Sequence, residues 1–382
     1  MRAVMSRAII DEFRIMLERL EPARPLALAT VVATEGSVYR RAGARMLIEP
    51  GGEALGSVSG GCLEADLQER AQRFAVDPRA QVISYDGLAD DGMPWGLGLG
   101  CNGRVTVVLQ PLVAADASWA RRVCRARARR AGAALATVFG GDALPAGVVL
   151  ALDEGAAGAA EFAPAAAPAS GAAVGGALQR ELAAALATRA THIARGLAGT
   201  DCAVLLEYLP PPVHLCLVGA GADAEPLAAA AVAQGWEVSV CDHRPALLQA
   251  ARFPDAVLRP GEPEAALAGL NPDARTAVII MTHHYERDRR ALAALAARPP
   301  AYLGLLGPRA RTARILGELE AAGASLAAVR GALHAPVGLA LGAETAEEIA
   351  VAIVAEIIAC FRGGRGGALR DRDAPIHDAG RG

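Results

Sequence analysis

Residues 213–224 read VHLCLVGAGADA, a short apolar run that leads directly into two glycines and a polar turn. The run Val213–Val218 is typical of a buried parallel strand. Gly219, Gly221 and Ala224 then match the pattern G-x-G-x-x-A. In that pattern the first glycine permits a tight turn, the second lets backbone approach a pyrophosphate, and the last small residue keeps helix and strand close. The start of the next helix would present amide donors to an anion.

The sequence after this motif predicts a doubly wound parallel-sheet Rossmann domain. A second apolar run, Trp236–Cys241, ends at Asp242, which lies 21 residues beyond Gly221, where a ribose-binding acid is expected. Two more apolar runs, Ala277–Met281 and Tyr302–Leu306, alternate with alanine-rich helical segments. Regular alternation of strands and helices favours a parallel sheet with helices on both faces.

Polar and glycine residues follow several of these strands, and the carboxyl ends of parallel strands meet at one crevice. We expect phosphates and a polar ring to fit there. The alternative for each side chain is a structural role, such as capping a loop, or exposure to solvent. The residues predicted to line the crevice are Gly219, Gly221, Asp242, Thr282, His283, Gly307 and Arg309.

Three consecutive prolines, Pro210–Pro212, cannot continue a helix or a strand and predict a domain boundary. The expected organisation is an N-terminal domain 1–209, a Rossmann-like domain 210–363 and a disordered tail 364–382. A capping box of Thr345 and Glu348 predicts the start of the last helix, which should stop at Gly363.

The N-terminal domain is expected to mix helices and strands. The segment 155–176 is almost entirely Ala, Gly and Pro, so we interpret it as a flexible surface excursion. The predicted helices are Ser6–Leu20, Cys62–Phe74 and Ala177–Leu197. The predicted strands are Leu26–Ala33, Arg45–Ile48, Ala54–Val58, Gln81–Tyr85, Arg104–Leu109, Ala134–Phe139, Val148–Leu152 and Cys202–Tyr208.

The turn Ser59-Gly60-Gly61-Cys62 lies between a predicted strand and a predicted helix, so its amides form a second candidate anion site. Cys62 would lie in the first helical turn, where the dipole favours thiolate, although Glu64 opposes that effect. Cys101 lies in a similar glycine-rich setting. Both thiols are candidates for handling sulfur or molybdenum; the alternative is a small residue packed under a turn.

Composition excludes several function classes. All 38 basic residues are arginine and the net charge is -3, so there is no basic footprint for nucleic acid. No long apolar stretch predicts a membrane span, and the segment Met1–Arg14 lacks the apolar core of a signal peptide. Seven dispersed cysteines without ligand spacing favour reduced thiols in the cytoplasm over disulfides or a metal site.

The chain resembles the XdhC/CoxI family of accessory proteins for xanthine dehydrogenase and related molybdenum hydroxylases. The resemblance runs nearly end to end and continues into the helix Glu344–Ile358. The motifs that carry it are Ala33–Ser37, Gly43–Met46, Gly56–Glu64, Gly98–Gly103, Gly219–Gly221, Asp242–Arg244, Thr282–His283 with Asp288, Gly304–Arg309 and His334–Leu339.

The resemblance implies a non-catalytic, homodimeric carrier that binds molybdenum cofactor as cargo, protects its sulfurated form and delivers it to a xanthine-dehydrogenase-like molybdenum hydroxylase. It also implies a cysteine desulfurase as sulfur donor. Three residues depart from the family pattern, which affects the polar contacts of the crevice but not the fold argument. They are Asp223, His284 and Ala340.

Two other functions fit the nucleotide motif. One is an NAD(P)-dependent oxidoreductase that uses Asp242 for the ribose, although no hydride-transfer site is evident beyond His283. The other is a nucleotide-sensing regulator, and fold alone does not choose among the three. The sequence leaves open the client enzyme, the plain or dinucleotide form of the cofactor, the domain that holds the pterin, which thiol acts and the oligomeric state.

Overall fold

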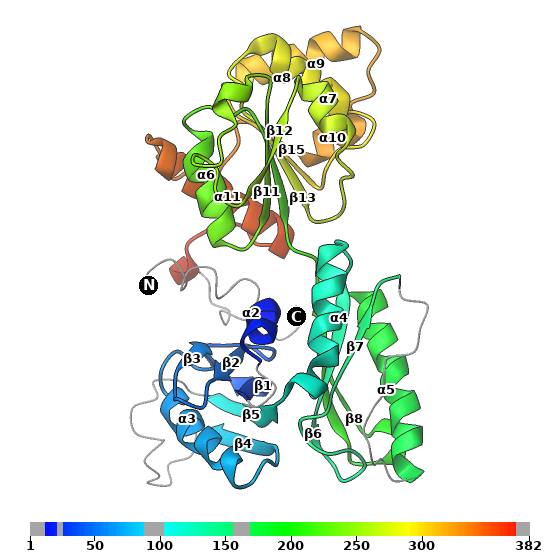
Figure 1. Ribbon diagram of the computed structural model, residues 1–382. Coiled ribbons are helices and arrows are strands. Elements are labelled where there is room, and N and C mark those ends of the chain that lie inside the picture. The colour runs from blue at the N-terminus through cyan, green and yellow to red at the C-terminus, as the bar shows by residue number, and fades with distance from the viewer. Residues whose placement is uncertain (1–11, 21–25, 88–102, 156–168, 372–382) are drawn as a thin grey trace. The chain divides into compact units, whose positions relative to one another are not determined.

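The structure is a computed structural model that describes residues 12–20, 26–87, 103–155 and 169–371. The chain forms two compact units that divide inside the triple proline, between Pro211 and Pro212 (Figure 1). Each unit has its own sheets and its own hydrophobic core. The units are therefore described one at a time.

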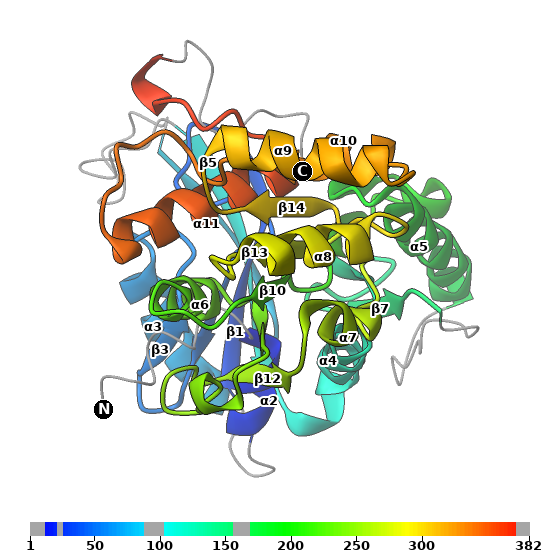
Figure 2. The same ribbon diagram turned by 90° about the horizontal axis from the view of Figure 1, so that it is seen from above.

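The second unit is built on a six-stranded parallel sheet in the order β12-β11-β10-β13-β14-β15. Seen from above, β12, β10, β13 and β14 follow one another across the unit (Figure 2). The order places β10 at the centre, with later strands on either side, as in dinucleotide-binding folds. The strands are β10 (His214–Val218), β11 (Glu237–Asp242), β12 (Ala256–Pro260), β13 (Thr276–Ile280), β14 (Tyr302–Leu305) and β15 (Leu333–His334).

Alternation along β10 explains why helices cover both faces. Leu215 and Leu217 pack into one core, whereas Cys216 and Val218 pack into the other. Side chains of a strand point to opposite faces in turn, so a wholly apolar strand needs cover on both sides. The covering helices are α6 (Ala224–Ala233), α7 (Pro263–Ala268), α8 (Tyr285–Leu295), α9 (Arg309–Ala321), α10 (Ala327–Ala332) and α11 (Ala346–Arg362).

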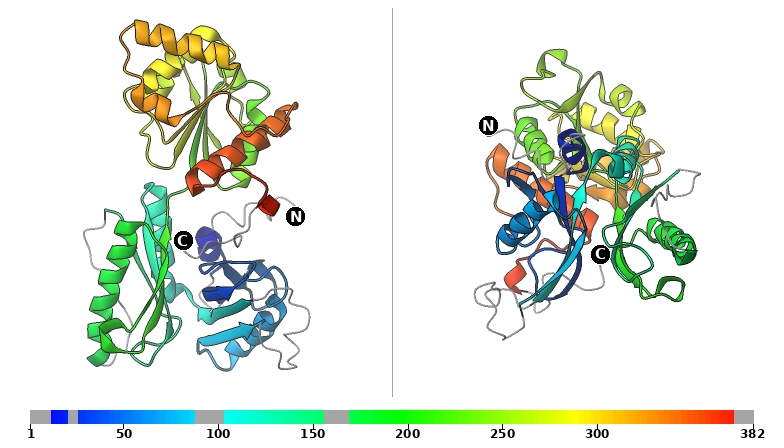
Figure 3. Two further views of the ribbon diagram at one scale, coloured as in Figure 1. Left: turned by 180° about the vertical axis from the view of Figure 1, so that it is seen from behind. Right: turned by 60° about the horizontal axis from the view of Figure 1, so that its bottom comes forward.

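Helices α6 and α11 pack together on one face, and α7 to α10 lie on the other (Figures 1 and 3). The predicted capping box of α11 is confirmed, because Thr345 accepts from the amide of Glu348 and the Glu348 carboxylate accepts from the amide of Thr345. The helix ends at Gly363 in the left-handed conformation. The predicted Rossmann-like parallel sheet is therefore confirmed.

The first unit holds two antiparallel sheets, ordered β3-β2-β1-β5-β4 and β7-β6-β9-β8. Its helices are α2 (Glu12–Arg19), α3 (Glu64–Gln72), α4 (Ser118–Ala128) and α5 (Ala169–Thr188). Its strands are β1 (Leu26–Gly36), β2 (Arg45–Ile48), β3 (Ala54–Gly56), β4 (Gln81–Asp86), β5 (Gly103–Leu112), β6 (Ala133–Gly140), β7 (Val149–Asp153), β8 (His192–Arg195) and β9 (Ala203–Leu209).

A buried ion pair ties the two sheets of the first unit together. Arg45 on β2 donates to the Glu207 carboxylate on β9 at 2.5 Å, and both side chains are nearly inaccessible. Glu12 on α2 lies 3.4 Å from the same guanidinium. Breaking such a pair leaves an uncompensated buried charge, so the contact fixes how the sheets meet. The mixed helix-and-sheet character expected for this domain is confirmed.

Three local predictions were wrong. The helix predicted over Ala177–Leu197 is α5, which starts at Ala169 inside the supposed flexible segment, because alanine is the strongest helix former. It ends at Thr188, since Arg189 adopts a positive φ of 55°, and β8 follows. Helix α3 begins at Glu64, two residues after the predicted start at Cys62. Residues 156–168 lie outside the described part.

The predicted tail is described only as far as residue 371. It contains a short 3-10 turn at Leu369–Asp371, and the amide of Gly364 donates to the carbonyl of Ala359 at 2.7 Å. The rest of the predicted tail, 372–382, lies outside the described residues.

Candidate functional site

The carboxyl edge of the parallel sheet gathers several of the predicted residues. Residues Val218, Cys241 and Ile280 lie side by side in register near the ends of β10, β11 and β13. Gly219, Asp242 and Thr282 follow there and line one small pocket of about 10 Å³. That volume holds a single water molecule and no larger group. A larger ligand would therefore have to lie over this edge.

Gly219 is required by the packing of the chain itself. Its φ is +124°, a conformation that side chains rarely adopt, and a Cβ there would lie 2.4 Å from the carbonyl oxygen of Met281. Its amide donates to the carbonyl of Cys241 at 2.8 Å. The first glycine of the motif thus joins the ends of three strands.

Gly221 leaves room for a different reason. A Cβ there would meet the Asp223 carboxylate at 2.6 Å and the His283 ring at 3.9 Å, so the nearest atoms belong to side chains and not to backbone. The amides of Ala224 and Glu225 are already bonded to the carbonyls of Gly221 and Ala222.

The amides just before α6 are not hydrogen-bonded within the described part of the chain. Within the described residues, those of Gly221, Ala222 and Asp223 have no acceptor. A helix N-terminus with unpaired amides is suited to an oxyanion, since the dipole adds to the hydrogen bonds.

Asp242 is saturated by its own chain. Its carboxylate accepts from the amide of Ala220 at 2.8 Å, from the amide of Arg244 at 2.8 Å and from the Arg244 guanidinium at 2.9 and 3.0 Å. The ring of His243 lies 3.1 Å away. A carboxylate offers about four lone-pair positions, and all of them are used.

The electrostatics of Asp242 follow from these contacts. Burial by itself would raise the pKa of this carboxyl, but the hydrogen bonds from Arg244 and from the Ala220 amide lower it to about 2. The predicted ribose-binding acid therefore lies in the predicted place as a permanent anion whose acceptors are already occupied.

His283 pairs with Asp223, the acid that departs from the family pattern after the glycine turn. Its Nε2 lies 2.7 Å from the Asp223 carboxylate, and its backbone has a positive φ of 56°. The imidazole is mostly exposed, at 59%. An anion at the amides of α6 would therefore lie beside this Asp223–His283 pair.

Asp288 is a buried acid that organises the loop after β13. The sequence indicates it only as part of a motif with Thr282 and His283. It accepts from the hydroxyl of Thr282 at 2.5 Å and pairs with Arg311 at 2.5 Å. It has no exposed surface. Arg311 in turn lies beside Gly307, so Asp288 links the loop after β13 to the first turn of α9.

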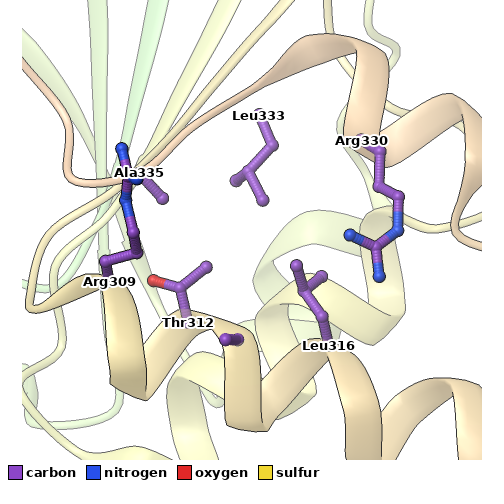
Figure 4. Close-up of a pocket in the computed structure, with 7 residues that line it drawn as sticks. Arg309, Thr312, Leu316, Arg330, Leu333 and Ala335 are labelled. Atoms are coloured by element: carbon purple, nitrogen blue, oxygen red, sulfur yellow. The ribbon is translucent and has the colours of Figure 1, made fainter.

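Arg309 is not part of this edge. Its side chain lines a separate pocket between α9, α10 and β15, together with Thr312 and Leu333 (Figure 4). Of the residues predicted for the crevice, the structure therefore brings together Gly219, Gly221, Asp242, Thr282 and His283, with Gly307 nearby, but not Arg309. The periodicity of the sequence does not predict the direction in which a side chain at the start of a helix, such as Arg309, points.

The Ser59-Gly60-Gly61 turn is filled by a residue of the chain. The Glu64 carboxylate accepts from the amides of Val58, Ser59, Gly60, Gly61 and Leu63 and from the hydroxyls of Ser57 and Ser59. The amides predicted to receive an anionic ligand thus already hold an internal anion.

The hydrogen bonds in this turn set the ionisation of Glu64. Burial opposes ionisation, but the hydrogen bonds from Ser59 and Ser57 outweigh it and lower the pKa of Glu64 to about 2. From the sequence, Glu64 is evident only as an unfavourable charge beside Cys62 and as the last residue of the motif Gly56–Glu64. Its position five residues after Ser59, at the start of α3, was the available indication.

Cys62 is exposed and precedes α3 by two residues, so it does not belong to the first helical turn. The ring of Tyr39 lies against Gly60, where a Cβ would come within 3.0 Å of it. Gly103 lies against the backbone of Glu35 and Ser37, so two of the motif segments meet there. Cys101 lies outside the described residues.

Two cysteines of the second unit lie close together. Cys216 and Cys241 have their sulfur atoms 3.8 Å apart in the buried sheet. Across the described ranges there is no group of three or more His, Cys, Asp or Glu residues suited to a metal ion. No helix in the described part is long and apolar enough to cross a membrane.

Comparison with known proteins links both units to one family. Residues 215–357 match the XdhC Rossmann domain, and residues 19–86 match the XdhC and CoxI family. A Bacillus subtilis (strain 168) protein, named as a probable xanthine dehydrogenase subunit, is 31% identical over 358 residues, which is 91% of this chain and 97% of that protein.

Two further relatives are similar over almost the whole chain. The molybdenum cofactor insertion chaperone PaoD of Escherichia coli (strain K12) is 26% identical over 348 residues, or 90% of this chain and 86% of that protein. A crystal structure described as a xanthine dehydrogenase from Bacillus halodurans superposes with a TM-score of 0.73 at 27% identity. That superposition covers 94% of this chain and 98% of the other.

Proposed function

The chain belongs to the XdhC and CoxI family, and from that premise we propose that it binds molybdenum cofactor as cargo and delivers it to a xanthine-dehydrogenase-like molybdenum hydroxylase. The observation that carries the proposal is the similarity to a molybdenum cofactor insertion chaperone over 90% of this chain. The role is one of binding, protection and transfer and needs no turnover of a substrate.

The N-terminus of α6 supports a contact with the phosphate group of the cofactor. The unpaired amides of Gly221, Ala222 and Asp223 point from a helix start, and Gly221 has no side chain to fill the space in front of them. A phosphate accepts several such hydrogen bonds at once, and the helix dipole favours its charge. The imidazole of His283 lies beside these amides, bonded to Asp223.

The small pocket at the sheet edge is not the phosphate site, because Gly221, Ala222 and Asp223 do not line it. A volume of about 10 Å³ does not admit a pterin ring. The ring and the molybdenum would therefore lie outside the pocket. We propose no further protein contact for the ring in this unit.

The state of Asp242 argues against the alternative of an NAD(P)-dependent oxidoreductase. In that use the acid must accept hydrogen bonds from ribose hydroxyls. Here its oxygens accept from Ala220 and Arg244, and a ribose would have to displace the guanidinium. The acid therefore serves to hold the glycine loop in place.

Cys62 is the thiol that we assign to the sulfur-bearing metal centre. It is exposed and lies outside a helix, so a soft metal centre can reach it without unfolding. Cys101 is the second candidate thiol for the same role as a ligand of the metal centre. We further propose that the protein works in the cytoplasm as a homodimer, with a cysteine desulfurase as the source of sulfur.

A delivery assay tests this function. The purified protein, loaded with cofactor in a cofactor-producing host, is mixed with a cofactor-free xanthine dehydrogenase, and hydroxylase activity is measured. The proposal predicts activity that rises with added carrier until the cofactor it brings equals the number of client sites. Activity no higher than that obtained with the unloaded protein would contradict it.

A further inference from the structure

A second pocket, which shares no lining residue with the pocket at the sheet edge, lies in the same unit. It has a volume of about 250 Å³ and lies between α9, α10 and β15. In Figure 4, Thr312 and Leu316 rise from α9, Leu333 points toward them from the opposite wall, and Arg309 and Arg330 stand on two sides. The residues that line it are Arg309, Thr312, Ala313, Leu316, Arg330, Leu333 and Ala335.

The pocket has an apolar floor because one face of α9 is turned toward it. Thr312, Ala313 and Leu316 follow Arg309 at spacings of three, four and seven residues, which places all four on one side of a helix. Leu333 and Ala335 form the facing wall. The volume is below the range for drug-sized ligands, so the pocket suits a small molecule with an apolar body.

A buried hydroxyl in this pocket has no partner. The Thr312 side chain is only 6% exposed, and its Oγ1 makes no hydrogen bond. Buried polar groups are nearly always hydrogen-bonded, since leaving one unpaired costs free energy. Because the oxygen itself has almost no accessible surface, a ligand in the pocket can bond to this hydroxyl once the Thr312 side chain turns about its Cα–Cβ bond.

The two arginines differ in their charge balance. Arg330 is paired with Glu320 at 2.8 Å. Within the described residues Arg309 has no ion pair and no hydrogen bond, so its guanidinium is uncompensated. The pocket thus carries one unpaired positive charge, which matches a monovalent anion better than a phosphate dianion.

We propose that this pocket binds a small carboxylic acid with an apolar or aromatic body. The carboxylate pairs with the Arg309 guanidinium and accepts from the Thr312 hydroxyl, while the body packs between Leu316 and Leu333. A planar carboxylate is the group that a guanidinium fork binds in two-point fashion. This site is separate from the α6 amides, and the proposal does not depend on cofactor delivery.

Benzoate and benzamide are the matched probes, because they share shape but only benzoate carries a charge. Binding to the full chain is measured by isothermal titration calorimetry. The proposal predicts saturable binding of benzoate and at least tenfold weaker binding of benzamide. Phenyl phosphate is the third probe, and tighter binding of phenyl phosphate than of benzoate would overturn the assignment to carboxylates.

Three variants locate the site. Arg309→Gln should weaken benzoate binding about tenfold or more, and Thr312→Val should weaken it by a factor of about three to ten. Arg314→Gln is the control, because Arg314 is on the same helix, pairs with Glu318 at 3.0 Å and does not line the pocket. Its affinity for benzoate should equal that of the unaltered protein.

A stability measurement guards against misfolding. Thr312→Val replaces an unpartnered buried hydroxyl by a methyl group, so the free protein should melt at the same or a higher temperature. Benzoate should raise the melting temperature of the unaltered protein more than that of this variant. A lack of saturable benzoate binding by the unaltered protein would overturn the proposal. So would folded Arg309→Gln and Thr312→Val variants that bind benzoate as tightly as the unaltered protein does.

Discussion

The carboxylate of Asp242, at the end of β11, accepts a hydrogen bond at 2.8 Å from the backbone amide of Ala220, in the glycine loop that follows β10. This contact ties the second strand of the nucleotide motif to its first turn. It makes Asp242 a support for the loop that presents the amides of Gly221 and Ala222. Ligand binding by the amides before α6 depends on that support.

Asp242→Asn should therefore destabilise the fold and disturb the loop. The pKa of Asp242 is lowered from 3.8 to about 2 in the folded chain, so its ionisation contributes stability. That contribution is about 2 kcal/mol, is complete above the unfolded pKa and is lost as the pH falls through about 2. Urea unfolding of both proteins at pH 6 and pH 3 should show a smaller difference at pH 3. A difference that is the same at both pH values would contradict this role.

Gly221→Val should remain folded and lose the cofactor. A Cβ at this position meets only the flexible carboxylate of Asp223 and the ring of His283, so the chain can adjust, but the space before the amides is filled. Pterin content after purification and circular dichroism are the measurements. Gly317→Ala on α9, where a Cβ meets nothing, is the control and should keep its pterin. A folded Gly221→Val protein with full pterin content would rule out the amide site.

Gly219→Val should behave differently, although it alters the same motif. The added side chain would collide with the backbone of Met281, which cannot move without parting the strands, and the φ of +124° is unfavourable for valine. We expect a loss of several kcal/mol and little soluble protein. Thermal unfolding of this variant beside Gly221→Val separates the two roles, and equal melting temperatures would show that the distinction is mistaken.

Glu64→Ala should empty the amide cluster at the Ser59-Gly60-Gly61 turn. The pKa of Glu64 is lowered from 4.5 to about 2, and because the group is partly exposed we expect a loss of about 1 to 2 kcal/mol near neutral pH. The loss should shrink as the pH falls from about 5 toward 2. Sulfate should restore stability to this variant by taking the vacated amides, and have no such effect on Glu69→Ala, an exposed acid of the same helix. A lack of any sulfate effect specific to Glu64→Ala would contradict this prediction.

Cys62→Ser should leave stability unchanged and reduce delivery of active cofactor. The residue is exposed, so the fold should tolerate a hydroxyl there, but serine is a poor ligand for a soft metal centre. Cys360→Ser, at the other exposed cysteine of the described residues, is the control. Full delivery by Cys62→Ser would remove this thiol from the proposed function.

The sequence predicts the parallel sheet well because β10, β11, β13 and β14 are apolar runs bounded by turns. It misses β12, whose residues are half exposed at the edge of the sheet, and β15, which is only two residues long. Alanine-rich segments are harder to assign, because low bulk is typical of both loops and helices. The start of α5 was placed too late for that reason.

The candidate site divides in the same way. Glycines and strand ends can be located from spacing, and Gly219, Asp242 and Thr282 do meet at one edge. Which acceptor takes which donor depends on side-chain reach, and that is invisible in a single sequence. For this reason the internal role of Glu64 and the turn of Arg309 away from the crevice became visible only in the structure.

The pterin content of the unaltered protein tests the central claim most directly. The protein is purified from a host that makes molybdenum cofactor, and the pterin is quantified by its fluorescence after acid–iodine oxidation. The same sample is assayed for oxidation of NADH. We predict about one pterin per chain or per pair of chains and no NADH turnover. A protein free of pterin that oxidises NADH with a carbonyl substrate would contradict the account.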